Sequence, residues 1–427
     1  MDGREQRRGA AASAAEDAGA GSLAAGTLFA GLRVLEFGSG AAGPIATRYF
    51  AEQGATVVRV ESRQRPDFLR VLHRRDDDPS SVDRAPMFAL LNADKLSVAI
   101  NLATPEGGAL ARDLALWADV VAENFAPGVM ARWGLDAESL LRRKSDLVVV
   151  SGCLFGQTGP QRGYPGFGGQ GSAISGFNHV TGYPDGDALG PYGTITDSLA
   201  PRFVATLVTA ALLERRRTGQ GQIIDLSQIE TGAYCLSETI VRRSAGAGVR
   251  TRDANAHEHV APHGIYPCRG DDRWIAVAVR GDDEWTALRR MMGDPGWARE
   301  EGFATAAGRV ARRDELDGLL GSWTADFDPY QLMDLLQAAG VEAGVVQNLD
   351  DLRADPQLAS RDHFVPLEHR HLGEMPFERS ALRFDGRPGR LERSAPDLGE
   401  HTEAVLREVL GLDRSEIARL RKSGVLS

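Results

Sequence analysis

The sequence has few of the residues that build metal centres or disulfide frameworks. It contains three cysteines among 427 residues, Cys153, Cys235 and Cys268, and none falls in a CxxC or Cys/His pattern. Cysteines so far apart argue against a zinc site and against a disulfide framework. They are typical of reduced thiols, so we expect a cytoplasmic protein without a metal site.

Positive charge and long apolar runs are scarce as well. Lysine and arginine number 49 against 59 aspartates and glutamates, which gives a formal net charge of -10. Nucleic acids and anionic membranes both attract clustered positive charge, so we expect neither as the main partner. No run approaches the roughly 18 uninterrupted apolar residues that suit a membrane-spanning helix, so we expect no membrane span. A local basic patch for a phosphorylated ligand is compatible with this balance.

Residues 1–27 form a segment rich in alanine and glycine. Glu5, Glu16 and Asp17 interrupt it, and it has no unbroken apolar core, which does not suit a signal peptide. We expect a disordered tail there.

From Leu32 onward, short apolar strands alternate with helical patterns. Helices are expected at residues 43–54 and 104–118, and strands at 32–37, 55–61, 96–102, 119–125, 146–153 and 223–230. Repeated units of this kind favour an α/β fold in which helices cover a parallel sheet. The first turn, "GSGAAGP", lacks the GxGxxG spacing, so a dinucleotide-binding fingerprint is not supported.

The loop-like residues 246–264 mark an expected change of domain. In the smaller unit that follows, strands are expected at 273–280 and 341–348, and helices at 282–293 and 328–340. The aromatic residues at helical spacing there are expected in its core: Trp285, Trp297, Trp323 and Phe327. Residues 400–426 predict two short amphipathic helices.

Several segments together resemble the class III CoA-transferase family, the formyl-CoA and carnitine-CoA transferase type, which includes alpha-methylacyl-CoA racemases. They are "GLRVLEF", "NADKLSVAINLATPEG", "ADVVAENFAPGVMARWGL", "GQTGPQRGYPGF", "TDSLAPRFVATLVTAALLERRRTGQGQIIDLSQIE" and "APDLGEHTEAVLREVLGL". They follow the family's order from about residue 30 to the C-terminus. The stretch "ANAHEHVAPHGIYPCRGDDRWIAVAV" is most similar to the branch of benzylsuccinate-type CoA-transferase subunits.

The resemblance implies a Rossmann-like large domain with a parallel sheet, made from both ends of the chain, and a smaller α+β domain from its middle. The corresponding bounds are 28–225 for the first part of the large CoA-binding domain, 226–350 for a linker and the small domain, and 351–427 for the return. In this family two such chains are typically interlocked as a dimer. The active site then lies between the large domain of one chain and the small domain of the other.

Asp197 precedes a long helical pattern and admits two interpretations. An aspartate in front of "SLAPRFVATLVTAALLERRR" is a good N-cap, Pro201 is tolerated in the first turn, and Gly219 is a suitable end. The spacing alone favours the cap. The resemblance instead implies that Asp197 is the family's nucleophile, which attacks an acyl-CoA thioester and forms an aspartyl anhydride and then an aspartyl-CoA thioester. A helix N-terminus would also favour its ionised form.

The resemblance also implies a set of CoA contacts at the first strand-to-helix turn and the "ENF" strand end. These residues are Gly40, Ala41, Ala42, Arg63, Lys95, Asn124, Phe125 and Arg132. The turn at Gly40 could equally be an ordinary tight turn, and Arg63 and Arg132 could be solvated surface charges. Ala126 stands where many relatives have arginine.

The loop "NAHEHVAPHG" occupies the place of the family's glycine-rich active-site loop without its run of glycines. Its histidines His257, His259 and His263 are candidates for contacting an acceptor carboxylate, or are loop histidines in solvent or at an interface. A racemase needs a second proton-transferring acid, and Gly168 stands at that position, which argues against a racemase.

The resemblance implies acyl-CoA and a small carboxylic acid as substrates, with no tightly bound cofactor. The first hypothesis is a CoA-transferase that works through Asp197, most simply as a homodimer. The alternatives are a non-catalytic or co-catalytic subunit of a heteromeric transferase and, third, a racemase.

Overall fold

The computed structural model describes residues 28–72, 79–246, 248 and 252–427. The expected tail, residues 1–27, lies outside this range. The chain divides into two compact units. The large unit comprises Met1–Gly171, Thr194–Gly232 and Asp362–Ser427, and the small unit comprises Ser172–Gly193 and Ala233–Arg361.

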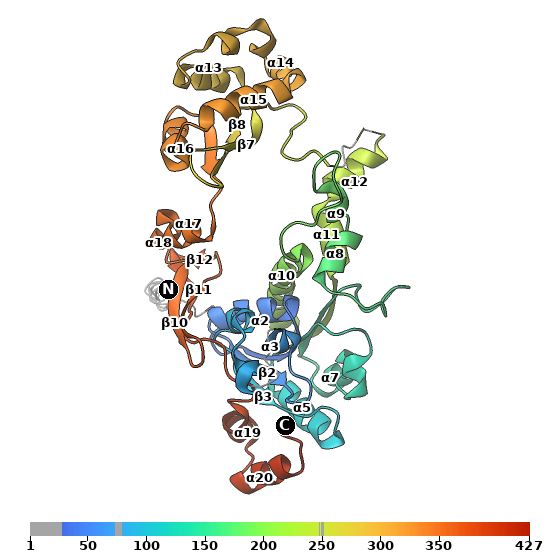
Figure 1. The fold of residues 1–427 in the computed structure, drawn as a ribbon. Coiled ribbons are helices and arrows are strands. Elements are labelled where there is room, and N and C mark those ends of the chain that lie inside the picture. The colour runs from blue at the N-terminus through green and yellow to red at the C-terminus, as the bar shows by residue number, and fades with distance from the viewer. Residues whose placement is uncertain (1–27, 73–78, 247, 249–251) are drawn as a thin grey trace, which may run out of the picture. The chain divides into compact units, whose positions relative to one another are not determined.

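A six-stranded parallel sheet forms the centre of the large unit (Figure 1). Its strands are β1 (Arg33–Phe37), β2 (Thr56–Glu61), β3 (Leu96–Ala99), β4 (Val120–Glu123), β5 (Val148–Cys153) and β6 (Gln222–Ser227). Their order is β3-β2-β1-β4-β5-β6, and every neighbouring pair is parallel. The predicted α/β class and parallel sheet are therefore confirmed. Strands β2 and β3 are added on one side of β1, and β4, β5 and β6 on its other side. The carboxyl ends of β1 and β4 are therefore the topological switch point of the sheet.

Helices cover both faces of this sheet because its strands are apolar on both sides. On one face α2 (Ala42–Glu52) and α10 (Ile195–Thr218) pack through residues such as Ala46, Phe50, Val204 and Val208. On the other face lie α5 (Pro105–Trp117), α7 (Ala137–Arg143), α19 (Thr402–Leu410) and α20 (Arg414–Lys422). The two predicted C-terminal helices are thus α19 and α20.

Shorter elements complete the large unit. The helices are α3 (Phe68–Val71), α4 (Pro86–Leu91), α6 (Val129–Arg132), the 3-10 turn at Pro79–Asp83, and α8 (Gly168–Ile174), which continues into the small unit. The C-terminal part adds the antiparallel pairs β10 (Phe364–His369) with β11 (Gly373–Glu378), and β12 (Arg383–Phe384) with β13 (Arg387–Pro388). Phe377 of β11 is buried against Leu69 and Phe88, so the C-terminal hairpin belongs to a hydrophobic core of this unit.

An antiparallel sheet, β7 (His263–Pro267), β8 (Trp274–Ala278) and β9 (Glu342–Val345), forms the small unit's centre. Its principal helices are α13 (Asp282–Met291), α14 (Ala306–Ala311), α15 (Arg313–Thr324) and α16 (Pro329–Ala338). Short helices lie at α9 (Phe177–Val180), α12 (Ser237–Ser244), α17 (Leu349–Ala354), α18 (Pro356–Ser360), Gly296–Arg299 and Glu301–Phe303, and α11 (Gln228–Cys235) spans the unit boundary. Trp285 is buried in the hydrophobic core of this unit, as predicted. The other predicted aromatic residues, Trp297, Trp323 and Phe327, pack against that core.

The α10 helix departs from one expectation. It begins at Ile195 with Thr194 as its N-cap residue, so Asp197 is the third helical residue and the N-cap interpretation is wrong. Gly219 ends the helix in a left-handed conformation, as expected.

Within the described residues α10 is the one helix long and apolar enough to cross a membrane by length and composition, which is weak evidence for a membrane span. Core helices of globular proteins pass the same test, and α10 packs on the sheet through Ala200, Val204 and Val208.

Candidate active site

The carboxyl ends of β1 and β4 meet at the switch point, where open parallel sheets usually bind ligands. Two hydrogen bonds join their loops: the Ser39 amide donates to Asn124 Oδ1 at 2.9 Å, and Asn124 Nδ2 donates to the Ser39 carbonyl at 2.8 Å. The structure thus brings the predicted CoA residues Gly40, Ala41 and Ala42 close to Asn124. Phe125 follows directly and stacks edge-on against Trp133.

The turn after β1 is held from the side of α3. Gly40 has a φ of +77°, and its amide donates to Asp67 Oδ2 at 3.0 Å. A Cβ at Gly40 would lie 2.6 Å from Cε1 of Phe68, so only glycine allows this approach. The Gly40 amide therefore already has a partner inside the protein.

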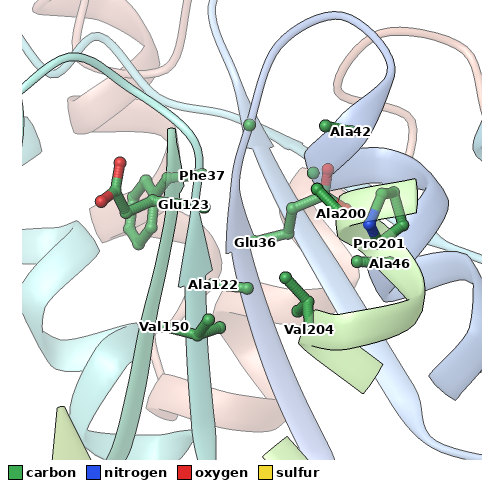
Figure 2. A pocket seen from close by; sticks show the side chains of 13 residues that line it. Glu36, Phe37, Ala42, Ala46, Ala122, Glu123, Val150, Ala200, Pro201 and Val204 are labelled. Atoms are coloured by element: carbon green, nitrogen blue, oxygen red, sulfur yellow. The ribbon is translucent and has the colours of Figure 1, made fainter. Parts of the chain in front are cut away.

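A narrow pocket of about 20 Å³ lies below this turn (Figure 2). Small residues line much of it, including Gly38, Ala42, Ala46, Ala122 and Ala200. Figure 2 shows Glu123 and Phe37 on one side of the strands, and Ala46 and Pro201 on the other. Larger side chains, among them Glu36, Phe37 and Val204, complete the lining. The pocket therefore has room for about one water molecule.

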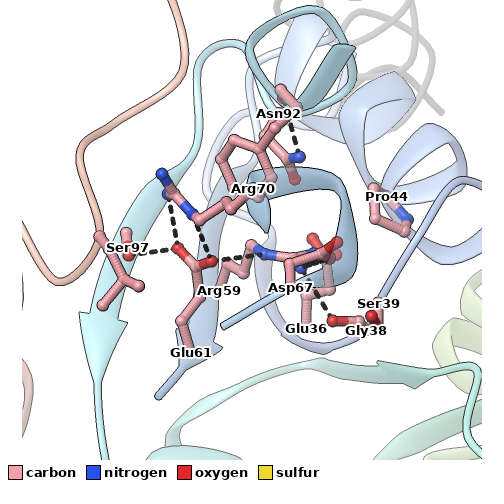
Figure 3. Close-up of polar contacts among 12 residues, drawn as sticks. Glu36, Gly38, Ser39, Pro44, Arg59, Glu61, Asp67, Arg70, Asn92 and Ser97 are labelled. Carbon is pink, nitrogen blue, oxygen red and sulfur yellow. Dashed lines mark hydrogen bonds and ion pairs between the residues drawn. The ribbon is translucent and has the colours of Figure 1, made fainter. Parts of the chain in front are cut away.

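A buried network of charges lies behind the same turn (Figure 3). Arg59 pairs with Glu36 and Asp67, and Arg70 donates to both carboxylate oxygens of Glu61 at 2.9 Å. Each of these charged groups is almost fully buried, so each needs its partners to offset the cost of leaving water. The network fixes the position of Asp67 and, through it, of Gly40.

Lys95 belongs to this network. Its ammonium donates to Glu36 Oε2 at 2.8 Å, to the Pro44 carbonyl at 2.9 Å and to Asn92 Oδ1 at 3.0 Å. Burial lowers the pKa of Lys95 to about 8, against the opposing effect of Glu36. Because all three of its protons are used, Lys95 supports the turn from inside and offers no donor to a ligand in this conformation.

The two predicted arginines lie at the surface. Arg63 is exposed and donates to the Leu398 carbonyl at 2.8 Å, and Arg132 is exposed at the last residue of α6. Both charges are therefore accessible to a phosphate.

Asp197 lies half-buried in the first turn of α10. Burial raises the pKa of its carboxyl group above the usual value, while hydrogen bonds from the Thr194 and Gln228 side chains act in the opposite direction. The net direction differs from the lowering expected from the helix N-terminus. A carboxylate that has lost part of its water shell is a stronger base and a less stabilised nucleophile.

Gly168 lies against the Asp197 carboxylate. An added Cβ at Gly168 would lie 2.5 Å from Asp197 Cγ and 2.7 Å from Thr194 Cβ, distances that no real side chain occupies. The Thr196 hydroxyl donates to the Gly168 carbonyl at 3.2 Å, which ties the start of α8 to the start of α10. The position where a racemase needs a second acid therefore has no room for any side chain.

The three histidines lie in the small unit. His263 Nδ1 is 2.6 Å from the Asn255 carbonyl, and the His257 and His263 rings have centroids 5.4 Å apart. His263 and Asn255 line a cavity of about 390 Å³ over Gly264, Ala276 and Gly344. These small residues leave an open face on the three-stranded sheet.

Glu123 is a site residue that the sequence prediction missed. It is 7% exposed at the end of β4 and accepts a hydrogen bond from the Phe125 amide at 2.7 Å. Burial raises its pKa to about 7, and the charge of Asp225 adds to the effect. Its place in the "ENF" segment was the available signal. Thr194 and Gln228, which contact Asp197, were also missed. Gln228 lies in the quoted segment "GQGQIIDLSQIE", but no pattern there indicated a contact with Asp197, and Thr194 precedes the quoted segment.

One group of possible metal ligands occurs among the described residues: Asp83, His371 and Asp397. Asp83 accepts from Arg70 at 2.8 Å, and Asp397 accepts from Arg370 at 2.7 Å. These arginines already neutralise both carboxylates, which weakens any attraction for a cation.

The chain matches known proteins over most of its length. The family model described as CoA-transferase family III matches residues 29–402. Among curated relatives, succinyl-CoA–D-citramalate CoA-transferase of Chloroflexus aurantiacus is 34% identical over 92% of this chain and 97% of its own. Succinate–glutarate CoA-transferase of Agrobacterium fabrum is 31% identical over 90% of this chain and 96% of its own.

A solved structure of a CaiB/BaiF family protein from Brucella suis superimposes with a TM-score of 0.81 at 29% identity. It covers 90% of this chain and 99% of its own. Another relative, the alpha subunit of succinyl-CoA–L-malate CoA-transferase of Chloroflexus aurantiacus, is 30% identical over 93% of this chain and 92% of its own. The agreement of family model, relatives and fold shows that this chain belongs to CoA-transferase family III and transfers CoA between an acyl-CoA and a carboxylate.

Proposed function

We propose that Asp197 is the nucleophile of this CoA transfer. The observation that supports it is the placement of its carboxylate: half-buried, held by Thr194 and Gln228, and facing the backbone of Gly168 without an intervening side chain. An ionised carboxylate in such a place can approach a thioester carbonyl, and covalent catalysis then divides one difficult exchange into easier steps.

The Asp197 carboxylate attacks the donor thioester, the C–S bond breaks, and CoA leaves as thiolate, so that Asp197 and the donor acyl group form a mixed anhydride. The thiolate attacks the Asp197 carbonyl, which releases the donor acid and leaves an aspartyl-CoA thioester. The acceptor carboxylate attacks this thioester, whose C–S bond breaks to release CoA thiolate and form a second anhydride. The thiolate then attacks the acceptor's acyl carbon and releases the Asp197 carboxylate. The product is the acceptor's CoA thioester, and Asp197 is regenerated.

CoA binds, in this proposal, at the turn Gly40–Ala42 and at Asn124 and Phe125, with Arg63 and Arg132 on its phosphates. Lys95 acts indirectly, because its contact with Glu36 and the Pro44 carbonyl stabilises the turn. Backbone amides and small residues at the carboxyl ends of strands suit a long thin ligand of this kind.

Succinyl-CoA is the donor that we propose, and a short dicarboxylic acid is the acceptor. Succinyl-CoA or succinate appears in the names of the D-citramalate, glutarate and L-malate transferases to which this chain is similar. The histidines His257, His259 and His263 are proposed to contact the acceptor's carboxylate, since a protonated imidazole can donate to it.

Replacement of Asp197 tests this function. The Asp197→Asn variant should lose transfer from succinyl-CoA to a panel of dicarboxylic acids by at least about 10³-fold, since it removes the nucleophile itself. Products are followed by mass spectrometry. Hydroxylamine should inactivate the wild-type enzyme only when acyl-CoA is present, by trapping Asp197 as a hydroxamate. Asp187→Asn, at an exposed aspartate, serves as the matched control and should transfer normally. Full transfer by Asp197→Asn would overturn the proposal.

A heteromeric subunit is the second candidate, because two relatives are named as subunits of one transferase: the alpha subunit at 30% identity and the beta subunit at 28%. The same assay separates the two candidates. Transfer by the purified chain without any second protein rules out a dependent subunit.

A further inference from the structure

A continuous series of contacts connects the proposed CoA turn to Asp197 within the large unit. The ring of Phe68 lies against Gly40, where a Cβ would be 2.6 Å from Phe68 Cε1. The Phe68 and Phe167 rings are in contact, with centroids 5.5 Å apart and planes inclined by 51°. Phe167 immediately precedes Gly168, which faces the Asp197 carboxylate.

Both rings are exposed although they are large and apolar. Phe68 is 38% exposed and Phe167 is 68% exposed. Exposed aromatic residues that touch each other form an apolar patch, and such patches beside a site commonly contact a ligand. Exposure of apolar rings to water is unfavourable in free energy, so an apolar part of a ligand that covers them binds favourably.

The chain on either side of Phe167 is held close to the protein. A Cβ at Gly166 would lie 2.6 Å from Leu154 Cδ2, and one at Gly168 would overlap Asp197. The Phe167 amide donates to Gln170 Oε1 at 2.9 Å, which adds a third constraint. The backbone is therefore fixed on both sides of a ring that remains largely uncovered.

We propose that Phe68 and Phe167 form an apolar wall along which the pantetheine arm and thioester of acyl-CoA lie between the turn at Gly40 and Asp197. This inference rests on the proposed function, which places CoA at one end of the contact series and the reacting carboxylate at the other. The methylene groups of the arm and its thioester can cover the rings, whereas the nucleotide phosphates gain nothing from them.

The wall contributes binding and not chemistry. Phe167→Ala should raise the KM for succinyl-CoA and the Kd for CoA by about tenfold, the size of a lost aromatic contact, and leave kcat within about twofold. Adenosine 3′,5′-bisphosphate, which lacks the pantetheine arm, should bind the variant as it binds the wild type. A loss of affinity for CoA but not for the bisphosphate shows that the ring contacts the pantetheine arm. A variant with a generally disturbed site would lose affinity for both ligands.

Phe68→Ala should have an effect in the same direction. Because the two rings touch, the double variant should lose less affinity than the sum of the single losses. Tyr164→Ala is the matched control: it removes another exposed aromatic ring from the same loop, one that pairs with Phe155 instead. Phe167→Leu keeps an apolar side chain and should retain most of the affinity.

Titration calorimetry with CoA and with the bisphosphate, together with steady-state kinetics, gives these quantities. The proposed contact with the pantetheine arm would be wrong if Phe167→Ala bound CoA as tightly as the wild type. It would also be wrong if the variant lost equal affinity for CoA and for the bisphosphate. Wild-type protein that binds CoA without transferring it would count against the proposed function alone, because the CoA titration still tests the rings. Circular dichroism on Phe167→Ala and Phe167→Leu checks that both variants are folded.

Discussion

At the scale of single residues, the contact between Gly168 and Asp197 determines what the site can do. The absence of a side chain at Gly168 leaves the carboxylate of Asp197, the proposed nucleophile, without a covering side chain on that side, and it removes the second acid that proton transfer would need. One glycine thus favours acyl transfer and disfavours racemisation.

Gly168→Ala should therefore reduce kcat strongly. The new methyl group cannot fit beside the Asp197 carboxylate, so the carboxylate must move, and a displacement of this kind costs about 10²-fold in rate. Gly169→Ala is the matched control, since a Cβ there meets nothing within 4 Å. Steady-state kinetics of both variants, with melting temperatures to check folding, measure the difference. Equal activity in the two alanine variants would contradict this account.

The position of Asp197 in its helix could not be predicted from its spacing. The N-cap role that the spacing favoured is wrong, because the helix begins two residues earlier. The family resemblance implied a nucleophile instead, and that role stays a prediction. The direction of the Asp197 pKa shift was also missed. Burial raises this pKa and outweighs the lowering by the hydrogen bonds from Thr194 and Gln228. Burial depends on the tertiary structure, which no local pattern around Asp197 reveals.

At the scale of secondary structure elements, three neighbouring strands share a row of polar residues near their carboxyl ends. Glu123 of β4 pairs with Ser151 of β5, which pairs with Asp225 of β6. Because residues in register share a face of the sheet, Glu123 and Asp225 both face the same side at the carboxyl edge. The negative charge of Asp225 adds to the effect of burial on Glu123.

Glu123 should make stability depend on pH. Its folded-state pKa of about 7 exceeds the usual value of 4.5, so the folded protein binds the proton more tightly than the unfolded chain. The free energy of unfolding should fall as pH rises from 4.5 to 7, by about 3 kcal/mol at most. Urea unfolding across this range should show that Glu123→Gln lacks this part of the loss. Glu408→Gln, at an exposed position of α19, should behave as the wild type. Parallel pH curves for wild type and Glu123→Gln would contradict the assignment.

Most elements could be predicted because apolar strands and capped helices have local patterns. All six strands of the parallel sheet lie within the predicted strand ranges or extend them by one residue. The buried charges could not be predicted in the same way. Lys95 looked like a ligand contact, whereas the fold leaves it 2% exposed. Only the tertiary structure brings Lys95, just before β3, to Glu36 of β1 and to the Pro44 carbonyl of α2.

At the scale of the whole molecule, the family resemblance predicts an interlocked homodimer. Light scattering coupled to gel filtration should give twice the mass of one chain. Two separately purified and differently tagged preparations should form no mixed dimers on incubation, because linked rings cannot separate without unfolding. Refolding the mixture from denaturant should then produce them. Rapid formation of mixed dimers without denaturant would argue against interlocking.

The assignment to CoA-transferase family III was within reach of the sequence because its motifs are spread over the chain in a fixed order. The acceptor acid was not, because the loop at residues 255–264, which we propose contacts the acceptor, departs from the glycine-rich pattern of the family. Substrate choice is set by a few contacts and not by the fold that supports them.

The C-terminal residues have a consequence for biosynthesis. The Pro396 carbonyl accepts from Arg70, the Gly399 amide donates to Ser97, and the Val425 carbonyl accepts from the Asn101 amide. These partners are synthesised after all six strands of the central sheet. A nascent chain that stops before residue 396 therefore carries the sheet without these hydrogen bonds to Arg70, Ser97 and Asn101, and the large unit is completed only when the segment up to Val425 has been made. We expect truncation of the last segment to be far more damaging to this protein than its distance from Asp197 in the sequence suggests.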